Sequence, residues 1–503
     1  MTDDLRFDEL LREDAAALPP PADGEITPWR TAMDRILWGM GLTTITLNFL
    51  WLDVILPAIG AVLLVLGFRT LRRENAPLRW GYRLSLLALA IRFAGDVLAA
   101  LPVDVGNTLA YVHIPVTLAL YVCLWQGMVG VSRAAGAEKP AAPAAGAMAV
   151  FYAALTALAL IGLEGWLLVL PLLALYLFLL RSMVRLSRSL TDTGYAITAA
   201  PVRLSDSAVL WGALGALLAA VLLAMFLGRR YPMDWHTRSD APQNETIRQQ
   251  LLAKGFPSYV LDDLTAEEVS RMAGAVRVYR QVERLYSDTD HRTITTTHYM
   301  SDPDRPLVYD HTITDVDGEG ERHYTYVYRV YDTLEQTMTH VAVELPAEDG
   351  AARFVYIHHL TYAAPPSPYT EMLELWPAWQ TQGGWSPGGH VSGRVLCEKN
   401  GTAQAAPFHT LESGSQQVSD LFGVRQTQKI TANWSFPRNA ESPRAYVFYD
   451  ALRGEDGWVI ESWANYVCQT APVYPFRDAA ALWHSYGSDA YSLRQTALQV
   501  FDG

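Results

Sequence analysis

Hydrophobic residues are concentrated in the first 230 positions, where they form runs long enough to enter a lipid bilayer. A hydrocarbon core about 30 Å thick requires about 20 residues of helix. Five runs meet or approach this length: Leu84–Leu101, Leu109–Val131, Ala147–Leu163, Trp166–Leu180 and Ala208–Leu227. The pattern predicts a bundle of membrane-spanning helices.

A longer apolar run precedes these five, from Ile36 to Phe68. As one helix it would measure about 50 Å, which is too long for a single crossing without extreme tilt. Two crossings, over about 36–52 and 54–68, place Asp53 and Pro57 at a turn between them. The interpretation gives seven spans; a single long crossing would give six.

Basic residues are confined to alternate connections between the predicted spans. One set of connections holds Arg69, Arg72, Arg73, Arg79, Arg83, Arg133, Lys139, Arg181, Arg185, Arg188 and Arg203. The other connections, "LPVDVGN" and "GLEG", hold neither Lys nor Arg. Since cytoplasmic loops are enriched in Lys and Arg, the basic connections are predicted to be cytoplasmic. The C-terminal part is then extracytoplasmic, and with seven spans the N-terminal tail is cytoplasmic.

The hydrophobic pattern changes beyond the last predicted span. Residues 230–275 read as short helices, with Asn244 and Thr265 as caps. Between residues 292 and 468, short stretches rich in Val, Ile, Thr and Tyr are separated by turn residues, which is typical of an antiparallel sandwich. Residues 480–501 are interpreted as a closing helix.

These patterns predict a seven-helix membrane bundle followed by an extracytoplasmic, mainly-β domain with short helices. The predicted domains are a cytoplasmic acidic amphipathic tail (1–33), a seven-helix transmembrane domain (34–229), a short helical linker (230–275) and a β-rich domain (276–503). The chain has a net charge of −13, and residues 231–503 carry 21 basic and 35 acidic residues. Such an acidic domain is a poor nucleic-acid ligand, because phosphate contacts need Lys and Arg.

Charged residues inside the apolar runs form the first candidate site. Arg92 and Asp96 share one run at i, i+4 spacing, and His113 lies in the next run. Charges at such depth usually face protein or water. If the two helices are antiparallel, Asp96 and His113 lie at matched depth. The group is either an ion pair that locks two helices or a cluster that responds to protons or a ligand.

Tryptophans and carboxylates near residue 376 form the second candidate site. Trp376, Trp379 and Trp385 lie within ten residues and could bind a sugar or a peptide, or could pack in the core. Glu371 and Glu374 precede them and are conceivable hydrolytic carboxylates, although sequence spacing cannot show such a pair.

The stretch "DVDGEGE" offers a weak calcium candidate, formed by Asp315, Asp317, Glu319 and Glu321. Hard cations prefer several oxygen ligands. The alternative is an exposed hairpin tip that turns at Asp317-Gly318.

Two cysteines of the β-rich part, Cys397 and Cys468, could form a disulfide if they face an oxidising compartment. His358 and His359 are adjacent on a predicted strand, so they should point to opposite faces and not bind one metal. No nucleophile elbow, phosphate loop or zinc motif occurs in the sequence. No catalytic residue and no cofactor are therefore predicted.

The sequence favours a non-enzymatic sensor or binding protein in the cell membrane. Its expected partners are the lipid bilayer, an envelope component or glycan outside, and a protein at the tail or the external domain. The alternatives are an envelope enzyme acting on glycans and a scaffold or accessory subunit of a membrane complex.

Overall fold

The computed structural model describes residues 28–45, 51–103, 108–136, 142–161, 166–193, 195–197, 203–287, 289–300, 307–348, 351–377, 385–420, 423–453, 459–485 and 489–501. Of the predicted tail, residues 1–27 lie outside these ranges. The chain divides into two compact units, Met1–Ala224 and Met225–Gly503, and each is treated by itself.

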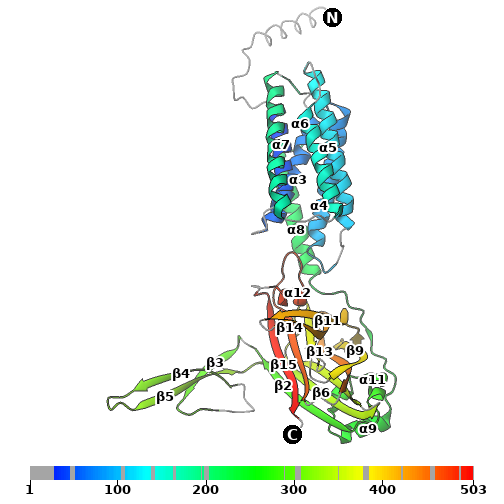
Figure 1. The fold of residues 1–503 in the computed structure, drawn as a ribbon, viewed down its shortest axis with the longest axis vertical. Coiled ribbons are helices and arrows are strands. Elements are labelled where there is room, and N and C mark those ends of the chain that lie inside the picture. Colours follow the sequence, from blue (N-terminus) through cyan, green and yellow to red (C-terminus); the bar gives the residue numbers. More distant parts are fainter. Residues whose placement is uncertain are drawn as a thin grey trace, which may run out of the picture. The chain divides into compact units, whose positions relative to one another are not determined.

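The first unit is a bundle of helices (Figure 1). Within the described residues they are α2 (Pro28–Thr44), α3 (Leu52–Leu71), α4 (Ala76–Leu98), α5 (Thr108–Ala134), α6 (Pro143–Ile161), α7 (Trp166–Asp192) and α8 (Asp206–Leu227). The core shared by α2 to α7 includes Trp29, Phe68, Leu124, Met148 and Tyr176.

Four of these helices are long and apolar enough to cross a membrane. The qualifying segments are Leu52–Leu71, Tyr111–Ala134, Leu168–Asp192 and Asp206–Leu227. The helix α4 is long enough but carries Arg79, Arg83, Arg92 and Asp96. The structure therefore supports a membrane-associated bundle.

The predicted boundaries of two helices were wrong. The helix α4 begins at Ala76, so Arg79 and Arg83 lie within it and not in a connection. Its start is fixed by Asn75, whose side chain accepts a hydrogen bond from the Leu78 amide at 3.0 Å. The helix α7 continues past Leu180 to Asp192, because arginine is a good helix former and does not end a helix.

The turn predicted at Asp53 and Pro57 is also displaced. Helix α2 ends at Thr44 and α3 begins at Leu52, so Asp53 lies in the first turn of α3 and Pro57 within that helix. The two helices are separate and pack closely through glycine. A Cβ atom added at Gly39 would lie 2.8 Å from the Gly60 carbonyl oxygen, and one added at Gly67 would lie 2.8 Å from the Ala32 carbonyl oxygen. These contacts show that α2 and α3 run antiparallel.

The second unit is built on antiparallel sheets, as the sequence predicts. One sheet has seven strands in the order β1 (His236–Thr237), β10 (Thr402–Ala406), β9 (Trp385–Lys399), β13 (Glu441–Arg453), β7 (Ala351–Tyr362), β6 (Leu334–Glu348) and β2 (Arg277–Tyr286). The other has five in the order β11 (Thr410–Asp420), β12 (Gly423–Trp434), β8 (Glu371–Trp376), β14 (Val459–Gln469) and β15 (Tyr491–Phe501). The two sheets form a sandwich, since side chains from both, such as Tyr356 and Tyr466, share one buried core.

Three short helices cover the outer face of the seven-stranded sheet. They are α9 (Glu245–Ala253), α10 (Ser258–Leu261) and α11 (Ala266–Arg271). Leu251, Val260 and Val269 share a buried cluster with Val355 and Phe448 of the sheet. The region predicted as a linker thus contributes to the hydrophobic core of the domain.

The predicted closing helix over residues 480–501 is wrong for most of its length. Among the described residues of this stretch, helix is confined to Ala479–Trp483 (α12), and Tyr491–Phe501 forms β15, which pairs with β14 along its whole length. Pairing with the exposed edge of β14 outweighs the helical propensity of these residues.

A third sheet stands apart from the sandwich (Figure 1). It has three strands in the order β3 (His291–Thr296), β5 (Arg322–Tyr331) and β4 (Leu307–Val316). It is inserted between β2 and β6, and we call it the arm. Within the described residues, no strand of the arm pairs with a strand of the other two sheets.

Candidate functional site

The predicted charge pair of the bundle is present on α4. The Arg92 guanidinium reaches both carboxylate oxygens of Asp96, with Nη2 at 3.1 Å from Oδ1 and Nε at 3.3 Å from Oδ2. Arg92 Nη2 also lies 3.4 Å from the backbone oxygen of Asp53 at the start of α3. The Asp96 side chain is only 8% exposed, and its pairing with Arg92 offsets the cost of burying a carboxylate.

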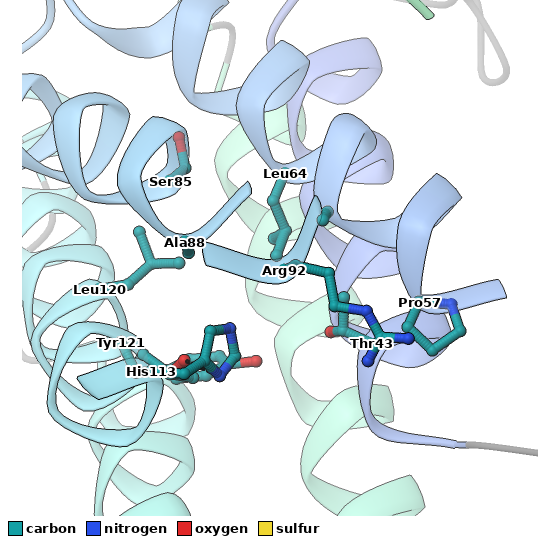
Figure 2. A pocket seen from close by; sticks show the side chains of 11 residues that line it. Thr43, Pro57, Leu64, Ser85, Ala88, Arg92, His113, Leu120 and Tyr121 are labelled. Carbon is teal, nitrogen blue, oxygen red and sulfur yellow. Dashed lines mark hydrogen bonds between the residues drawn. The ribbon is translucent and has the colours of Figure 1, made fainter. Parts of the chain in front are cut away.

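Arg92 and His113 line one cavity between helices α2, α3, α4 and α5 (Figure 2). Arg92 reaches into it from α4, toward Thr43 and Pro57, while His113 and Tyr121 enter from α5. The cavity wall is completed by Ala61, Leu64, Ser85, Ala88, Thr117 and Leu120. Asp96 is not among the lining residues, and His113 forms a hydrogen bond within its own helix, with the Thr117 hydroxyl at 3.4 Å from Nδ1. The cavity therefore combines the Arg92 cation, the His113 imidazole and hydroxyl groups with an apolar wall.

A second pocket adjoins the first and shares Thr43, His113, Thr117 and Tyr121 with it. Its further lining includes Thr44, Ile114, Leu118, Tyr152 and Thr156. The Thr44 hydroxyl is hydrogen-bonded to the Tyr152 hydroxyl, and the Tyr121 and Tyr152 rings stack at 3.9 Å between centroids. The sequence interpretation missed this hydroxyl lining. The sequence did contain one sign of this lining: the i, i+4 spacing of Thr117 and Tyr121 places both hydroxyl groups on one face of a helix.

The predicted tryptophan cluster is divided between two sheets. Trp376 ends β8 in the five-stranded sheet, and Trp385 begins β9 in the seven-stranded sheet. Trp385 packs edge-on against Phe354, with ring centroids 5.1 Å apart, beside the domain core. Trp379 lies outside the described residues. Packing therefore accounts for Trp385.

The two conceivable hydrolytic carboxylates, Glu371 and Glu374, do not share a site. Both are fully buried on β8, three residues apart, and so they point to opposite faces of the sheet. Glu371 accepts hydrogen bonds from the Tyr362 and Tyr466 hydroxyls, and burial raises its pKa to about 7. Glu374 is paired with Lys429 at 3.0 Å. Each carboxylate is held by its own partners within the domain, as is usual for buried charged residues that stabilise a fold.

His358 and His359 point to opposite faces of β7, as predicted. His358 faces the space between the two large sheets, where its Nδ1 lies 2.7 Å from Nδ1 of His340 and its Nε2 lies 2.9 Å from the Ser462 hydroxyl. Burial lowers the pKa of His340 to about 3, so this pair is neutral. His359 faces the helical side and bonds Asp263 at 2.9 Å.

The predicted calcium stretch forms the tip of the arm. Asp317 accepts hydrogen bonds from the Glu319 and Glu321 amides and so closes the turn. The groups close enough to share an ion are Asp317, Glu321 and His323, all exposed, and not Asp315 or Glu319. The turn explains the spacing of these acids.

The disulfide that Cys397 and Cys468 could have formed is not present. Both residues are free thiols, Cys397 on β9 of the seven-stranded sheet and Cys468 on β14 of the five-stranded sheet. Burial raises the pKa of the Cys397 thiol to about 11, so it is unreactive at neutral pH.

Comparison with known proteins adds no functional assignment. No family model and no curated protein matches the sequence. One similar solved structure is described as "Complete structure of manganese lipoxygenase of Gaeumannomyces graminis and partial structure of zonadhesin of Komagataella pastoris". The matched chain is 10% identical, with 44% of this chain and 85% of that chain covered, at a TM-score of 0.18. A likeness at this level carries no argument about fold or function.

Proposed function

We propose that this protein is a multi-pass membrane sensor or binding protein without enzymatic activity. In this proposal α2 to α8 form seven spans, the N-terminal tail is cytoplasmic, and the β-rich domain is extracytoplasmic. The domain would bind a ligand, an envelope component or a partner protein. The bundle would anchor it and relay binding to the tail and inner connections. The distribution of Lys and Arg between the connections supports this orientation.

The observation that carries the sensing role is the cavity lined by Arg92 and His113. A bundle that served only as an anchor would gain nothing from Arg92 and His113 facing an internal cavity, because cavities and buried polar groups both lower stability. A histidine side chain ordinarily changes its charge near neutral pH, and the Arg92 guanidinium on the same cavity would repel a positive charge gained by His113. A charge gained by His113 would therefore act on helices α2 to α5 together.

Replacing His113 by Gln is expected to remove a pH-dependent change in the bundle without unfolding it. The full chain in lipid nanodiscs would be titrated from pH 8 to pH 5 while its tryptophan emission is recorded. We expect the wild-type emission to change across this range and the change to be smaller in H113Q. Glutamine is similar in size to histidine and can also form hydrogen bonds, but it cannot be protonated in this pH range.

The matched control is His323→Gln, which removes an exposed histidine of the arm and should leave the bundle response unchanged. A titration of H113Q that matches the wild type would refute the sensing role. A large fall in unfolding temperature for H113Q at every pH would instead show that the cluster only locks the helices.

A further inference from the structure

Three arginines of the second unit lie close together beside the end of α8: Arg229, Arg230 and Arg438. The first two follow α8, which ends at Leu227, after a single glycine. The guanidinium carbons of Arg229 and Arg438 lie 5.1 Å and 5.3 Å from the centroid of the Phe226 ring. Burial lowers the pKa of Arg230, and the charges of Arg229 and Arg438 lower it further. Three positive charges therefore share one small region, which we call the arginine cluster.

The arginine cluster has no anionic partner among the described residues. No described carboxylate forms an ion pair with any of its three members. The Nε atoms of Arg229 and Arg230 are buried and have no hydrogen-bond acceptor within the described chain. By contrast, Arg238, Arg394 and Arg444 of the same domain each pair with an aspartate. Because unpaired buried donors and neighbouring like charges both cost free energy, a bound anion would stabilise the cluster.

The backbone beside Arg229 is fixed to the β-rich domain. The Tyr231 amide donates a hydrogen bond to the Ser435 hydroxyl at 3.1 Å, and this hydroxyl donates to the Tyr369 backbone oxygen at 2.9 Å. The Tyr231 hydroxyl donates to Asp478 at 2.6 Å. The guanidinium carbon of Arg229 also lies 5.7 Å from the centroid of the Tyr369 ring. The cluster is thus held in place before a ligand arrives, which lowers the cost of ordering it on binding.

We propose that the arginine cluster binds the phosphate group of an anionic membrane lipid. A guanidinium can donate two parallel hydrogen bonds to phosphate oxygens, and it can do so while it lies over an aromatic ring. The helix α8 is long and apolar enough to cross a membrane, and it ends two residues before Arg229. A span that ends there places the cluster at the level of the lipid headgroups.

The charge of the surrounding domain limits the choice of ligand. Residues 231–503 carry 21 basic and 35 acidic residues, so the domain would repel a long polyanion such as a nucleic acid. A lipid phosphate needs only a local cluster, and each basic residue next to a span strengthens the attraction to anionic lipids about fivefold. A free phosphate ion has the same chemistry but is not concentrated at the membrane surface.

This inference rests on one part of the proposed function, namely that α8 crosses the membrane. It depends neither on the side that the β-rich domain faces nor on the sensing role of the cavity in the bundle. The lipid would hold the start of the domain at the membrane surface, because the cluster joins residues that follow α8 to Arg438, far along the chain.

The proposal is tested by photo-cross-linking of the full-length protein in nanodiscs. These contain phosphatidylcholine and a small fraction of phosphatidylglycerol with a photoreactive headgroup. The yield of cross-linked peptides from residues 225–240 and 435–441 would be measured by mass spectrometry. We expect the wild type to be cross-linked there, and unlabelled phosphatidylglycerol to compete where additional phosphatidylcholine does not. Replacing all three arginines by glutamine (R229Q/R230Q/R438Q) should lower the yield by about tenfold or more.

Further variants separate a loss of binding from a loss of folding. The single change Arg438→Gln alters an exposed side chain and should lower the yield about fivefold. The control R280Q/R284Q/R322Q removes three exposed arginines elsewhere in the same domain and should leave the yield unchanged. Inorganic phosphate should suppress the cross-link no more than chloride does at the same ionic strength.

A wild-type yield in R438Q or in the triple variant overturns the proposal. So does an equal loss in the control, which would show that overall charge and not this cluster attracts the lipid. Specific suppression by inorganic phosphate would assign the cluster to a soluble anion and overturn the lipid assignment. A chain that stays monodisperse without detergent would show that α8 does not cross a membrane, and the proposed function would then fail as well.

Discussion

Replacing Asp263 by Asn is expected to lower the free energy of unfolding of the β-rich domain by about 3 kcal/mol. The Asp263 side chain is 5% exposed and joins the helical segment to the seven-stranded sheet. It accepts hydrogen bonds from His359 Nε2 at 2.9 Å and from Arg444 Nε at 2.8 Å. Arg238 Nη1 is a third donor, at 3.2 Å. Asparagine would leave Arg444 without its counter-charge, whereas Arg238 would keep its second partner, Asp240.

The pH dependence of this loss has a definite sign. Burial by itself raises the pKa of Asp263, but the bonds from His359 and Arg444 outweigh it, and the pKa is lowered below 3.8. A carboxylate whose pKa is lowered by folding stabilises the fold at any pH above the pKa that it has in the unfolded chain. This contribution is lost as the pH falls below about 4.

Thermal unfolding of the full chain, followed by near-UV circular dichroism at pH 7, measures the effect. The control is Asp262→Asn at the neighbouring position, where the carboxylate is 58% exposed and pairs with Arg248. That change should cost less than 1 kcal/mol. Equal losses from D262N and D263N would contradict the buried network.

Replacing Gly60 by Leu is expected to separate α2 from α3 and to cost at least 1–3 kcal/mol. A Cβ atom at this position would lie 2.9 Å from the Gly39 carbonyl oxygen and 3.0 Å from the Leu42 Cβ atom. Backbone atoms cannot move aside as a side chain can. Small residues that let helices approach closely are a main source of helix association within membranes.

The matched control is Gly215→Leu in α8, where an added Cβ atom would have nothing within 4 Å. The unfolding temperature in detergent should fall for G60L and stay near the wild-type value for G215L. A G60L protein as stable as the wild type would show that α2 and α3 do not pack through these glycines.

The general architecture could be predicted from the sequence because it depends on local patterns. Apolar runs indicated the bundle, and strands rich in Val, Ile and Tyr indicated an antiparallel sandwich. The pair Arg92 and Asp96 was also predictable, since i, i+4 spacing places both on one helix face.

The features that were missed depend on contacts distant in sequence. The strand β15 was misread as a helix because only pairing with β14 makes it a strand. The arm could not be separated from the sandwich, since its strands have the same composition as those of the larger sheets. The hydroxyl lining of the bundle combines residues of α2, α5 and α6, which come together only after the helices pack.

Chemical labelling of single cysteines tests the proposed seven-span orientation most directly. In a chain without Cys123, Cys397 and Cys468, one cysteine would be placed at Ala16 in the tail or at Ser270 on α11. An impermeant maleimide should label S270C in intact cells and A16C only after permeabilisation. Labelling of both cysteines in intact cells would show that the tail and the β-rich domain lie on the same side of the membrane, which requires an even number of spans. Protection of S270C would place the β-rich domain inside and contradict the proposal.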